Sequence, residues 1–304
     1  MKSVQEIQEF YLTKIYPKLG ALEKERKILL IQLLLGGGFI YLLGVSIVGL
    51  LIYNNPDFII IILLYIWFGG LFTHLVFIFF RSSISGDFQD EFKKTTMNVT
   101  LQELSTDVTY EPTQFIQTNR LKHFNLFKYY DDDNGDDYIK GTFAKHTVEF
   151  SQIYLGTKET TSFRGLIFLS KLDVPAELNF SIVHYRFKHN QDQAMGMIES
   201  DFNKQNRYSI YADNRFDTQN IINKELFELL DVLKESFSQP FSLLVHQKEL
   251  LLAIEYGENE FIDPTLIKSL KAYQDIVLFT AAMQSFIAMA NHIEQEPEAL
   301  TLVW

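Results

Sequence analysis

Two uninterrupted apolar runs lie in the first third of the chain. Residues 28–53 and 58–80 contain no Asp, Glu, Lys or Arg, and only the four residues Asn-Asn-Pro-Asp at 54–57 separate them. A membrane-spanning helix needs about 20 predominantly apolar residues. The pattern therefore predicts a transmembrane hairpin over residues 28–80, with the lipid bilayer as its immediate surroundings.

The basic residues on either side of this hairpin predict its orientation. Residues 1–27 contain six Lys or Arg, Arg81, Lys93 and Lys94 follow the second run, and the connecting turn contains none. Lys and Arg are enriched on the cytoplasmic side of membrane proteins. We therefore expect a multi-pass protein of the cell membrane with both termini in the cytoplasm. The first run is too long for the apolar core of a signal peptide, so it is expected to remain as an anchor.

The segments flanking the hairpin are polar or amphipathic. Residues 1–27 are expected to be helical on both sides of Pro17, with an apolar stripe on one face. That amphipathic helix is expected in the cytoplasm, either on the membrane surface or packed on the cytoplasmic domain or on a second copy, and packing is the commoner outcome. Residues 81–119 are weakly patterned and are predicted to form a juxtamembrane connector.

Apolar and polar residues alternate from residue 120 onward, which is typical of strands. Residues 120–304 are predicted to form a cytoplasmic α+β domain with an antiparallel sheet. Helices are expected at 224–234, where Asn223 is a candidate N-cap, and from Asp263-Pro264 to about His292, with a weaker one near 191–202. The apolar part of the last helix is too short and polar for a third span. The expected strands are 122–130, 138–143, 146–155, 163–170, 179–187, 208–212, 241–246 and 249–254.

An acidic run at 131–137 is the first candidate for chemistry, since five of its seven residues are Asp. A calcium-binding EF-hand loop needs Gly at its sixth position and Glu at its twelfth. Counted from Asp131, those positions hold Asp136 and Thr142. The pattern therefore predicts an exposed hairpin turn with Asn134-Gly135 at its tip and positive φ there.

No catalytic, cofactor-binding or metal-binding residues can be assigned from motifs. The chain has no cysteine, which excludes disulfides and thiolate metal sites. It contains no phosphate-binding loop, no dinucleotide-binding fingerprint and no serine-hydrolase elbow. His74 lies inside the second apolar run. A hydrogen bond across the helix pair is a simpler role for it than a proton or ion path. His123, His146 and His184 would form a cluster only if the sheet brought them together.

The charge is strongly negative and unevenly distributed. The formal net charge is -11, and residues 95–304 hold eighteen Lys or Arg against thirty Asp or Glu. Phosphate backbones repel such a domain, so nucleic acid is not expected as a partner.

Three functions remain open. The first is a membrane-anchored, non-catalytic interaction or scaffold protein, with a protein partner and a possible homo-oligomer. The second is a ligand-binding or enzymatic domain whose pocket uses scattered residues such as His123, His146 and Arg164. The third is an oligomeric channel or transporter component, for which the uncharged spans offer little polar lining.

The order of several short motifs resembles the bacterial two-span membrane proteins of the domain-of-unknown-function 3137 family. These motifs include Thr-Lys-Ile-Tyr-Pro-Lys-Leu at 13–19, Asp-Tyr-Ile-Lys-Gly at 137–141 and Phe-Arg-Gly-Leu-Ile-Phe at 163–168, followed by the helix at 224–234 and the hairpin at 241–254. The resemblance implies a bacterial cell membrane and no established activity. It also implies a LemA-type membrane protein as a candidate partner.

Overall fold

The computed structural model describes most of the chain. The described residues are 4–54, 90–127, 130–157, 160–190, 196–198, 208–213, 220–237, 239–256, 269–270 and 274–295. The second predicted span, residues 58–80 with His74, lies outside them. The chain divides into two units: one comprises Met1–Ile15, Met97–Ile262 and Gln274–Trp304, and the other Tyr16–Thr96 and Asp263–Tyr273.

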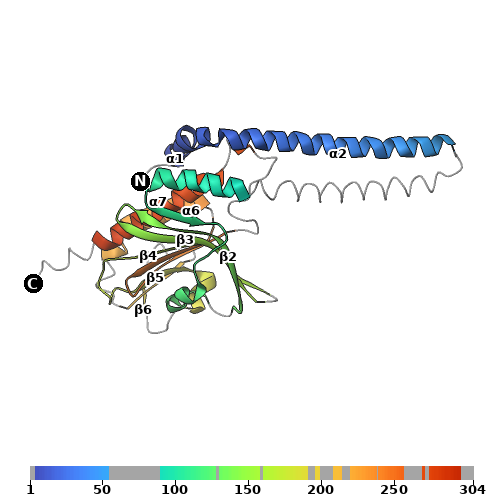
Figure 1. Cartoon of the computed structure of the whole chain (residues 1–304). Helices are drawn as coiled ribbons and strands as arrows, with labels where there is room; N and C mark the ends of the chain where they lie inside the picture. The colour runs from blue at the N-terminus through green and yellow to red at the C-terminus, as the bar shows by residue number, and fades with distance from the viewer. Residues whose placement is uncertain are drawn as a thin grey trace, which may run out of the picture. The chain divides into compact units, whose positions relative to one another are not determined.

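A nine-stranded sheet forms the centre of the first unit (Figure 1). Its order is β1-β2-β3-β4-β9-β8-β5-β7-β6, and each described pair of neighbours is antiparallel. The predicted antiparallel sheet is therefore confirmed. The strands are β1 (Val108–Glu111), β2 (Asp132–Phe143), β3 (His146–Gly156), β4 (Thr161–Lys171), β5 (Phe180–His184), β6 (Gly196–Ile198), β7 (Tyr208–Ala212), β8 (Phe241–His246) and β9 (Glu249–Glu255).

The central strands are buried on both faces, so they read as nearly continuous apolar runs. One face packs under the segment that contains the 3-10 helix η4 (Thr118–Phe124), and Leu121 and Phe124 of η4 join its core. Phe127 lies against Phe163 of β4, with ring centroids 4.6 Å apart. A second 3-10 helix, η5 (Tyr185–Asn190), adds Phe187 to the same cluster.

Helices α6 (Lys224–Phe237) and α7 (Gln274–Gln295) contact each other, and α7 covers the opposite face (Figure 1). Phe279 of α7 lies 5.1 Å from Phe150 of β3, and Phe286 lies 5.5 Å from Phe168 of β4, as ring-centroid distances. The predicted long C-terminal helix is thus confirmed over its described part. Most of α7 is buried in this packing, although its length and composition alone would also suit a membrane span.

Local capping and turn geometry explain two correctly predicted elements. The Asn223 side-chain oxygen accepts hydrogen bonds from the backbone N–H groups of Glu225 and Leu226, which makes it the N-cap of α6. Gln247 and Lys248 join β8 to β9 with φ angles of 49° and 65°. Positive φ at both central residues is the geometry of a two-residue type I′ hairpin.

The N-terminal helix α1 (Val4–Phe10) contacts α7 within the first unit. It continues into a π-helix, Tyr11–Ile15, whose Tyr11 and Ile15 are buried. A 3-10 helix, Tyr16–Leu19, follows and contains Pro17, so the helix is interrupted where a proline removes a backbone donor. Packing on the sheet domain is therefore the observed outcome for the start of the predicted amphipathic segment.

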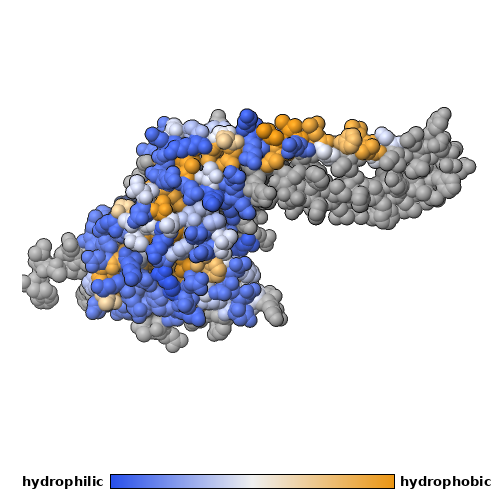
Figure 2. Space-filling model, viewed as in Figure 1, coloured by the Kyte–Doolittle hydropathy of each residue, from blue (hydrophilic) through white to orange (hydrophobic). Residues whose placement is uncertain are grey.

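Helix α2 (Gly20–Asn54) belongs to the second unit and exposes a long apolar surface. Figure 2 shows apolar side chains along this helix. By length and composition, two described helical stretches suit a membrane span, Gln8–Gly44 and Asp275–Gln295. The apolar part of Gln8–Gly44 is not buried, whereas most of Asp275–Gln295 in α7 is. The exposed large apolar residues of α2 are Ile28, Ile31, Leu34, Leu35, Phe39, Leu42 and Leu43.

The acidic run was wrongly predicted to be a turn. Asp132 to Asp136 belong to β2 and pair with β3, and the register shifts between Asp136 and Ile139. Gly135 has no positive φ. A Cβ there would lie 2.4 Å from the Gln152 carbonyl oxygen, so close approach of the neighbouring strand explains this glycine better than a turn does. The positive φ, 58°, falls instead on buried Asp137, whose carboxylate accepts a hydrogen bond from the Tyr110 hydroxyl.

Three further local predictions are corrected. The expected strand at 122–130 does not form over its described residues: 122–124 are the end of η4, and 125–127 and 130 have no strand. Leu121 and Phe124, three positions apart, both point to the core, which suits a 3-10 helix. Residues 196–198 of the expected weak helix form β6. Residues 90–104 are helical and β1 follows, so the sheet begins at Val108, inside the segment expected to be a connector.

We expect Gly165→Ala to destabilise the sheet strongly. An added Cβ would lie 2.0 Å from the Ile254 carbonyl oxygen, a backbone atom of β9 that cannot rotate away. Overpacking of this kind costs about 1–3 kcal/mol or more. Thermal unfolding of the full-length chain in detergent would measure the loss.

Gly20→Ala at the start of α2 is the matched control. A Cβ there meets nothing within 4 Å, and the φ of Gly20 is not positive. We expect unchanged or slightly raised stability, by up to about 1 kcal/mol. Equal melting temperatures for the two variants would contradict the close β4–β9 approach.

Candidate functional site

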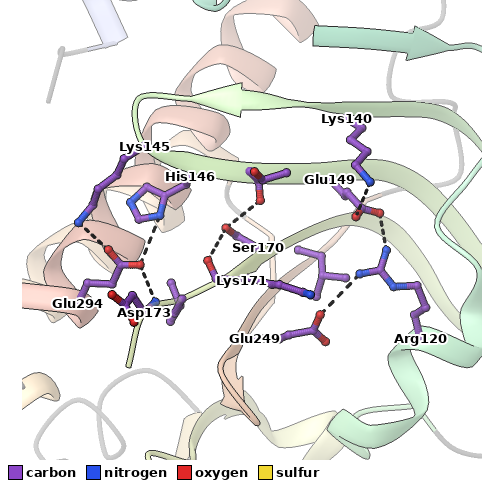
Figure 3. A pocket seen from close by; sticks show the side chains of 13 residues that line it. Arg120, Lys140, Lys145, His146, Glu149, Ser170, Lys171, Asp173, Glu249 and Glu294 are labelled. Carbon is purple, nitrogen blue, oxygen red and sulfur yellow. Dashed lines mark hydrogen bonds and ion pairs between the residues drawn. The ribbon is translucent and has the colours of Figure 1, made fainter. Parts of the chain in front are cut away.

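A polar pocket of about 880 Å³ lies at one end of the sheet. It forms where the β2–β3 hairpin, the end of β4 and the start of β9 meet η4 and the C-terminal end of α7 (Figure 3). All of these elements belong to the first unit. The lining residues are Arg120, Lys140, Lys145, His146, Thr147, Glu149, Leu169, Ser170, Lys171, Leu172, Asp173, Glu249 and Glu294.

One side of the pocket is an ion-pair group centred on Arg120. Its guanidinium lies 2.5 Å from the Glu149 carboxylate and 3.6 Å from that of Glu249. Lys140, which faces Glu149 across the β2–β3 register, approaches the same carboxylate at 3.6 Å. His123, just outside the lining, lies 3.1 Å from Glu249. We call Arg120, Lys140, Glu149 and Glu249, together with Lys171, the arginine side.

Tyr138 adds a neutral donor to this side. Its hydroxyl donates a 2.9 Å hydrogen bond to Glu149. Burial raises the pKa of Tyr138 to about 12, and the hydrogen bond and the negative charge of Glu149 act in the same direction. The phenol therefore stays protonated at neutral pH and holds Glu149 in place as a donor. Glu149 is only 12% exposed.

The other side of the pocket is built around Glu294 near the end of α7. Its carboxylate lies 2.5 Å from the Lys145 ammonium and accepts a 2.9 Å hydrogen bond from the backbone N–H of Asp173. His146, which is 2% exposed, lies between two residues of α7: its Nδ1 is 3.7 Å from Glu294 and its Nε2 is 2.9 Å from the Asn291 side-chain oxygen. We call Lys145, Asp173 and Glu294 the α7 side.

The surroundings of Glu294 favour its charged form. Burial by itself would raise the pKa of this carboxyl group. The hydrogen bonds from Lys145 and from the Asp173 backbone, with the nearby positive charges, outweigh burial, and the pKa lies below its ordinary value of 4.5. Glu294 is therefore ionised at neutral pH and ties α7 to the β2–β3 hairpin and to the end of β4.

The floor between the two sides carries hydroxyl groups without an activating base. Ser170 donates to the Thr147 carbonyl oxygen at 3.0 Å, and also approaches the Lys171 carbonyl oxygen. Its hydroxyl is thus engaged by backbone rather than by His146. Within the described part of the chain, no group of three or more His, Asp or Glu side chains is arranged to hold a metal ion. The arrangement is suited to binding a charged or dipolar ligand.

A second, smaller pocket of about 270 Å³ lies elsewhere on β2, β3 and β4. Its lining residues are Asn134, Gly135, Asp136, Gln152, Tyr154 and Arg164.

The candidate residues from the sequence fall in different places. His146 lines the main pocket, His123 touches it through Glu249, and Arg164 lines the smaller pocket, so the three do not share one site. His184 contacts the rings of Tyr185 and Tyr208 instead. Sequence reasoning missed Glu149, Glu249 and Glu294 because no local spacing links them.

The chain's relationship to known proteins is clearest in its second half. Residues 161–295 match the model of the family described as protein of unknown function, DUF3137. The predicted resemblance to this family is thereby confirmed over residues 161–295, and the bacterial origin and the two spans stay predictions. The DUF3137 match runs from β4 to the end of α7 and includes Lys171, Asp173, Glu249 and Glu294 of the pocket, but not the residues of η4, β2 and β3.

No curated protein matches the chain. Among solved structures, the crystal structure of the mycobacterial trehalose monomycolate transport factor A, TtfA, is similar over 62% of this chain and 86% of its own. The TM-score is 0.37 and the sequence identity is 8%.

We expect Glu294→Gln to lower stability at neutral pH by about 1.5–3 kcal/mol, the range for a hydrogen bond to a charged group. Since the folded-state pKa of Glu294 is lowered, its contribution is present above pH 4.5 and disappears as the pH falls through the lower folded-state pKa. The wild type should therefore lose more stability than the variant between pH 6 and pH 3, measured by denaturant unfolding.

Glu235→Gln on the exposed face of α6 is the control and should preserve the wild-type pH dependence. An identical pH dependence for Glu294→Gln and the wild type would show that Glu294 is not held in its charged form.

Proposed function

We propose that this chain is a membrane-anchored, non-catalytic protein whose sheet domain binds a partner at the cytoplasmic face of the membrane. The observation that carries the proposal is the exposed apolar surface of α2. Leu34, Leu35, Phe39 and Leu42 are each more than 60% exposed. An uncharged surface of this length is unfavourable in water and favourable in lipid.

The start of α2 suits a membrane boundary. Glu23 and Arg26 lie one turn before the first exposed apolar residue and form a buried pair at 2.8 Å. Glu23 also accepts a hydrogen bond from the backbone N–H of Leu270 in the same unit. The hydrogen bond from Arg26 is the largest influence on the Glu23 carboxyl group and holds its pKa below the ordinary value, despite burial. Glu23 and Arg26 are thus fixed just before the apolar stretch begins, and Lys27, the last charged residue, lies 3.7 Å from the Glu23 carboxylate.

The packing of α1 on α7 supports a hairpin. Residues 4–10, which precede α2, lie in the same unit as the sheet domain, which follows it. If α2 crosses the bilayer, the chain must cross back before that domain. The uncharged run at 58–80 is long enough to do so. The basic residues near both ends of the hairpin favour the cytoplasm for this shared side.

The main pocket favours binding over catalysis. Its acidic side chains Glu149, Glu249 and Glu294 each have a basic partner, and Ser170 donates to backbone. A nucleophile needs an adjacent base or a lowered pKa. A tethered ligand-binding domain is the second candidate, because a volume of about 880 Å³ falls within the range of small-molecule sites.

The cysteine-free sequence allows a direct test of this topology. Single cysteines would replace Gln8 before α2, Asn55 in the turn and Glu177 in the domain, and intact bacterial cells would be treated with a membrane-impermeant maleimide. We expect labelling at position 55 alone, with positions 8 and 177 labelled only after permeabilisation. Labelling of position 177 in intact cells, or labelling of positions 8 and 177 on different sides, would overturn the hairpin.

The partner would be sought by purifying the full-length protein from its native membrane in mild detergent and identifying co-purifying proteins by mass spectrometry. We expect a protein partner, with a LemA-type membrane protein as the first candidate. A variant without residues 105–304 keeps the hairpin and serves as the control. A stoichiometric partner lost with the domain supports the interaction role. A purified protein that turns over a small molecule would replace this proposal with an enzymatic one.

A further inference from the structure

The main pocket has its opposite charges sorted to opposite sides. The α7 side holds two carboxylates, Asp173 and Glu294, against the single ammonium of Lys145. The arginine side holds three cations, Arg120, Lys140 and Lys171, against the two carboxylates of Glu149 and Glu249. Counted over the carboxylates, ammonium groups and guanidinium alone, the α7 side has an excess of one negative charge and the arginine side an excess of one positive charge. Figure 3 shows the two groups on either side of Ser170.

The excess charges belong to exposed side chains. Lys171 and Asp173 lie two residues apart at the end of β4, and both are exposed. In Figure 3, Lys171 points toward the arginine side and Asp173 lies beside Glu294. Lys171 lies opposite Glu249 in the β4–β9 backbone register, so the two side chains are on the same face of the sheet. Within the described part of the chain, neither side chain has a charged partner within 4 Å.

Glu149 and Glu294 form an ordered frame beside these two groups. Glu149 and Glu294 are 12% and 10% exposed, and each is fixed by more than one donor. A frame that is already ordered loses little conformational entropy when a ligand binds. Lys171 and Asp173 are therefore the groups available for a new ion pair at each side.

The charge balance selects for a ligand without net charge. The lining cations and carboxylates cancel, whereas the whole chain carries -11. The overall field therefore opposes a simple anion, and the wet, charged lining opposes an apolar ligand. A molecule with one ammonium and one anionic group avoids both penalties.

We propose that this pocket binds a zwitterionic small ligand, with its ammonium group at Asp173 and Glu294 and its anionic group at Lys171 and Arg120. Free amino acids and short peptides have this chemistry, as does the ethanolamine phosphate headgroup of a lipid. The inference does not depend on the membrane placement of α2, since all lining residues belong to the first unit.

The test is calorimetric titration of the full-length protein in a non-ionic detergent. The probes are ω-amino acids from glycine to 6-aminohexanoate, dialanine, and glycerophosphoethanolamine, whose phosphodiester carries a single negative charge. Since charge separation rises along the series, we expect one length to bind best. N-acetylation or amidation of that ligand should weaken binding about tenfold or more, because each removes one charge-assisted contact. Binding of glycerophosphoethanolamine alone would assign the lipid headgroup, and vesicles containing phosphatidylethanolamine would then compete with it.

Two variants test the assigned sides. Lys171→Gln and Asp173→Asn should each reduce affinity about tenfold or more, with an unchanged melting temperature, because both side chains are exposed. Lys122→Gln and Asp213→Asn alter exposed residues outside the lining and are the matched controls. The proposal is overturned if no probe binds at 50 mM, if capped and free ligands bind equally, or if the control variants weaken binding as much as the pocket variants do.

The outcome is separable from that of the membrane proposal. Failure of every zwitterion to bind would leave the cysteine-labelling pattern unchanged, and an altered labelling pattern would not affect titration of the pocket.

Discussion

The packing of α7 on the sheet is the contact on which the rest of the first unit depends. Phe279 and Phe286 lie against Phe150 and Phe168 at the centre of β3 and β4. Buried aromatic side chains dominate core energetics, and truncation of one to alanine typically costs about 3–5 kcal/mol. The same helix contacts α6 and α1 on its other surfaces. A change that displaced α7 would therefore also displace α1, and with it the segment that leads to α2.

The same helix also contributes to the main pocket. Asn291 and Glu294 are one turn apart on α7, and together they hold His146 at the start of β3. Glu294 reaches the ammonium of Lys145 and the backbone of Asp173 as well. The position of the α7 side thus follows from core packing at Phe279 and Phe286, about one and a half to four turns earlier in the helix. The packing of α7 on the sheet therefore determines both the core and the α7 side of the pocket.

The fold was predictable where local patterns are sufficient, and the pocket was not. Alternation and short apolar runs between turns predicted most strands. Asn223 predicted the start of α6, and the apolar runs on either side of Gln247-Lys248 predicted the β8–β9 hairpin. The wrong predictions concern segments whose local sequence is compatible with two structures. The aromatic spacing around Phe124 suits a 3-10 helix as well as a strand. The Asn134-Gly135 pair suits a turn as well as a strand with a close neighbour.

The pocket escaped prediction because its contacts are distant in the sequence. His146 and Asn291 are 145 positions apart, and Arg120 meets Glu149 only after η4 folds over the sheet. No residue spacing along the chain predicts contacts between positions so far apart. The register does place Lys140 opposite Glu149, but it becomes informative only when the β2–β3 pairing is known.

Stability alone is a weak explanation for so many charges at one end of the sheet. The side chains of Arg120, Lys140 and Lys145 are 38%, 52% and 57% exposed, and ion pairs with an exposed partner contribute little to stability, about 0–1 kcal/mol. Apolar side chains at this end of the sheet would therefore stabilise the fold equally well. What the charged version adds is a fixed pattern, with Glu149 and Glu294 held by several donors and Lys171 and Asp173 left exposed between them. Such a pattern discriminates among ligands by the positions of their charges, which an apolar surface does not do.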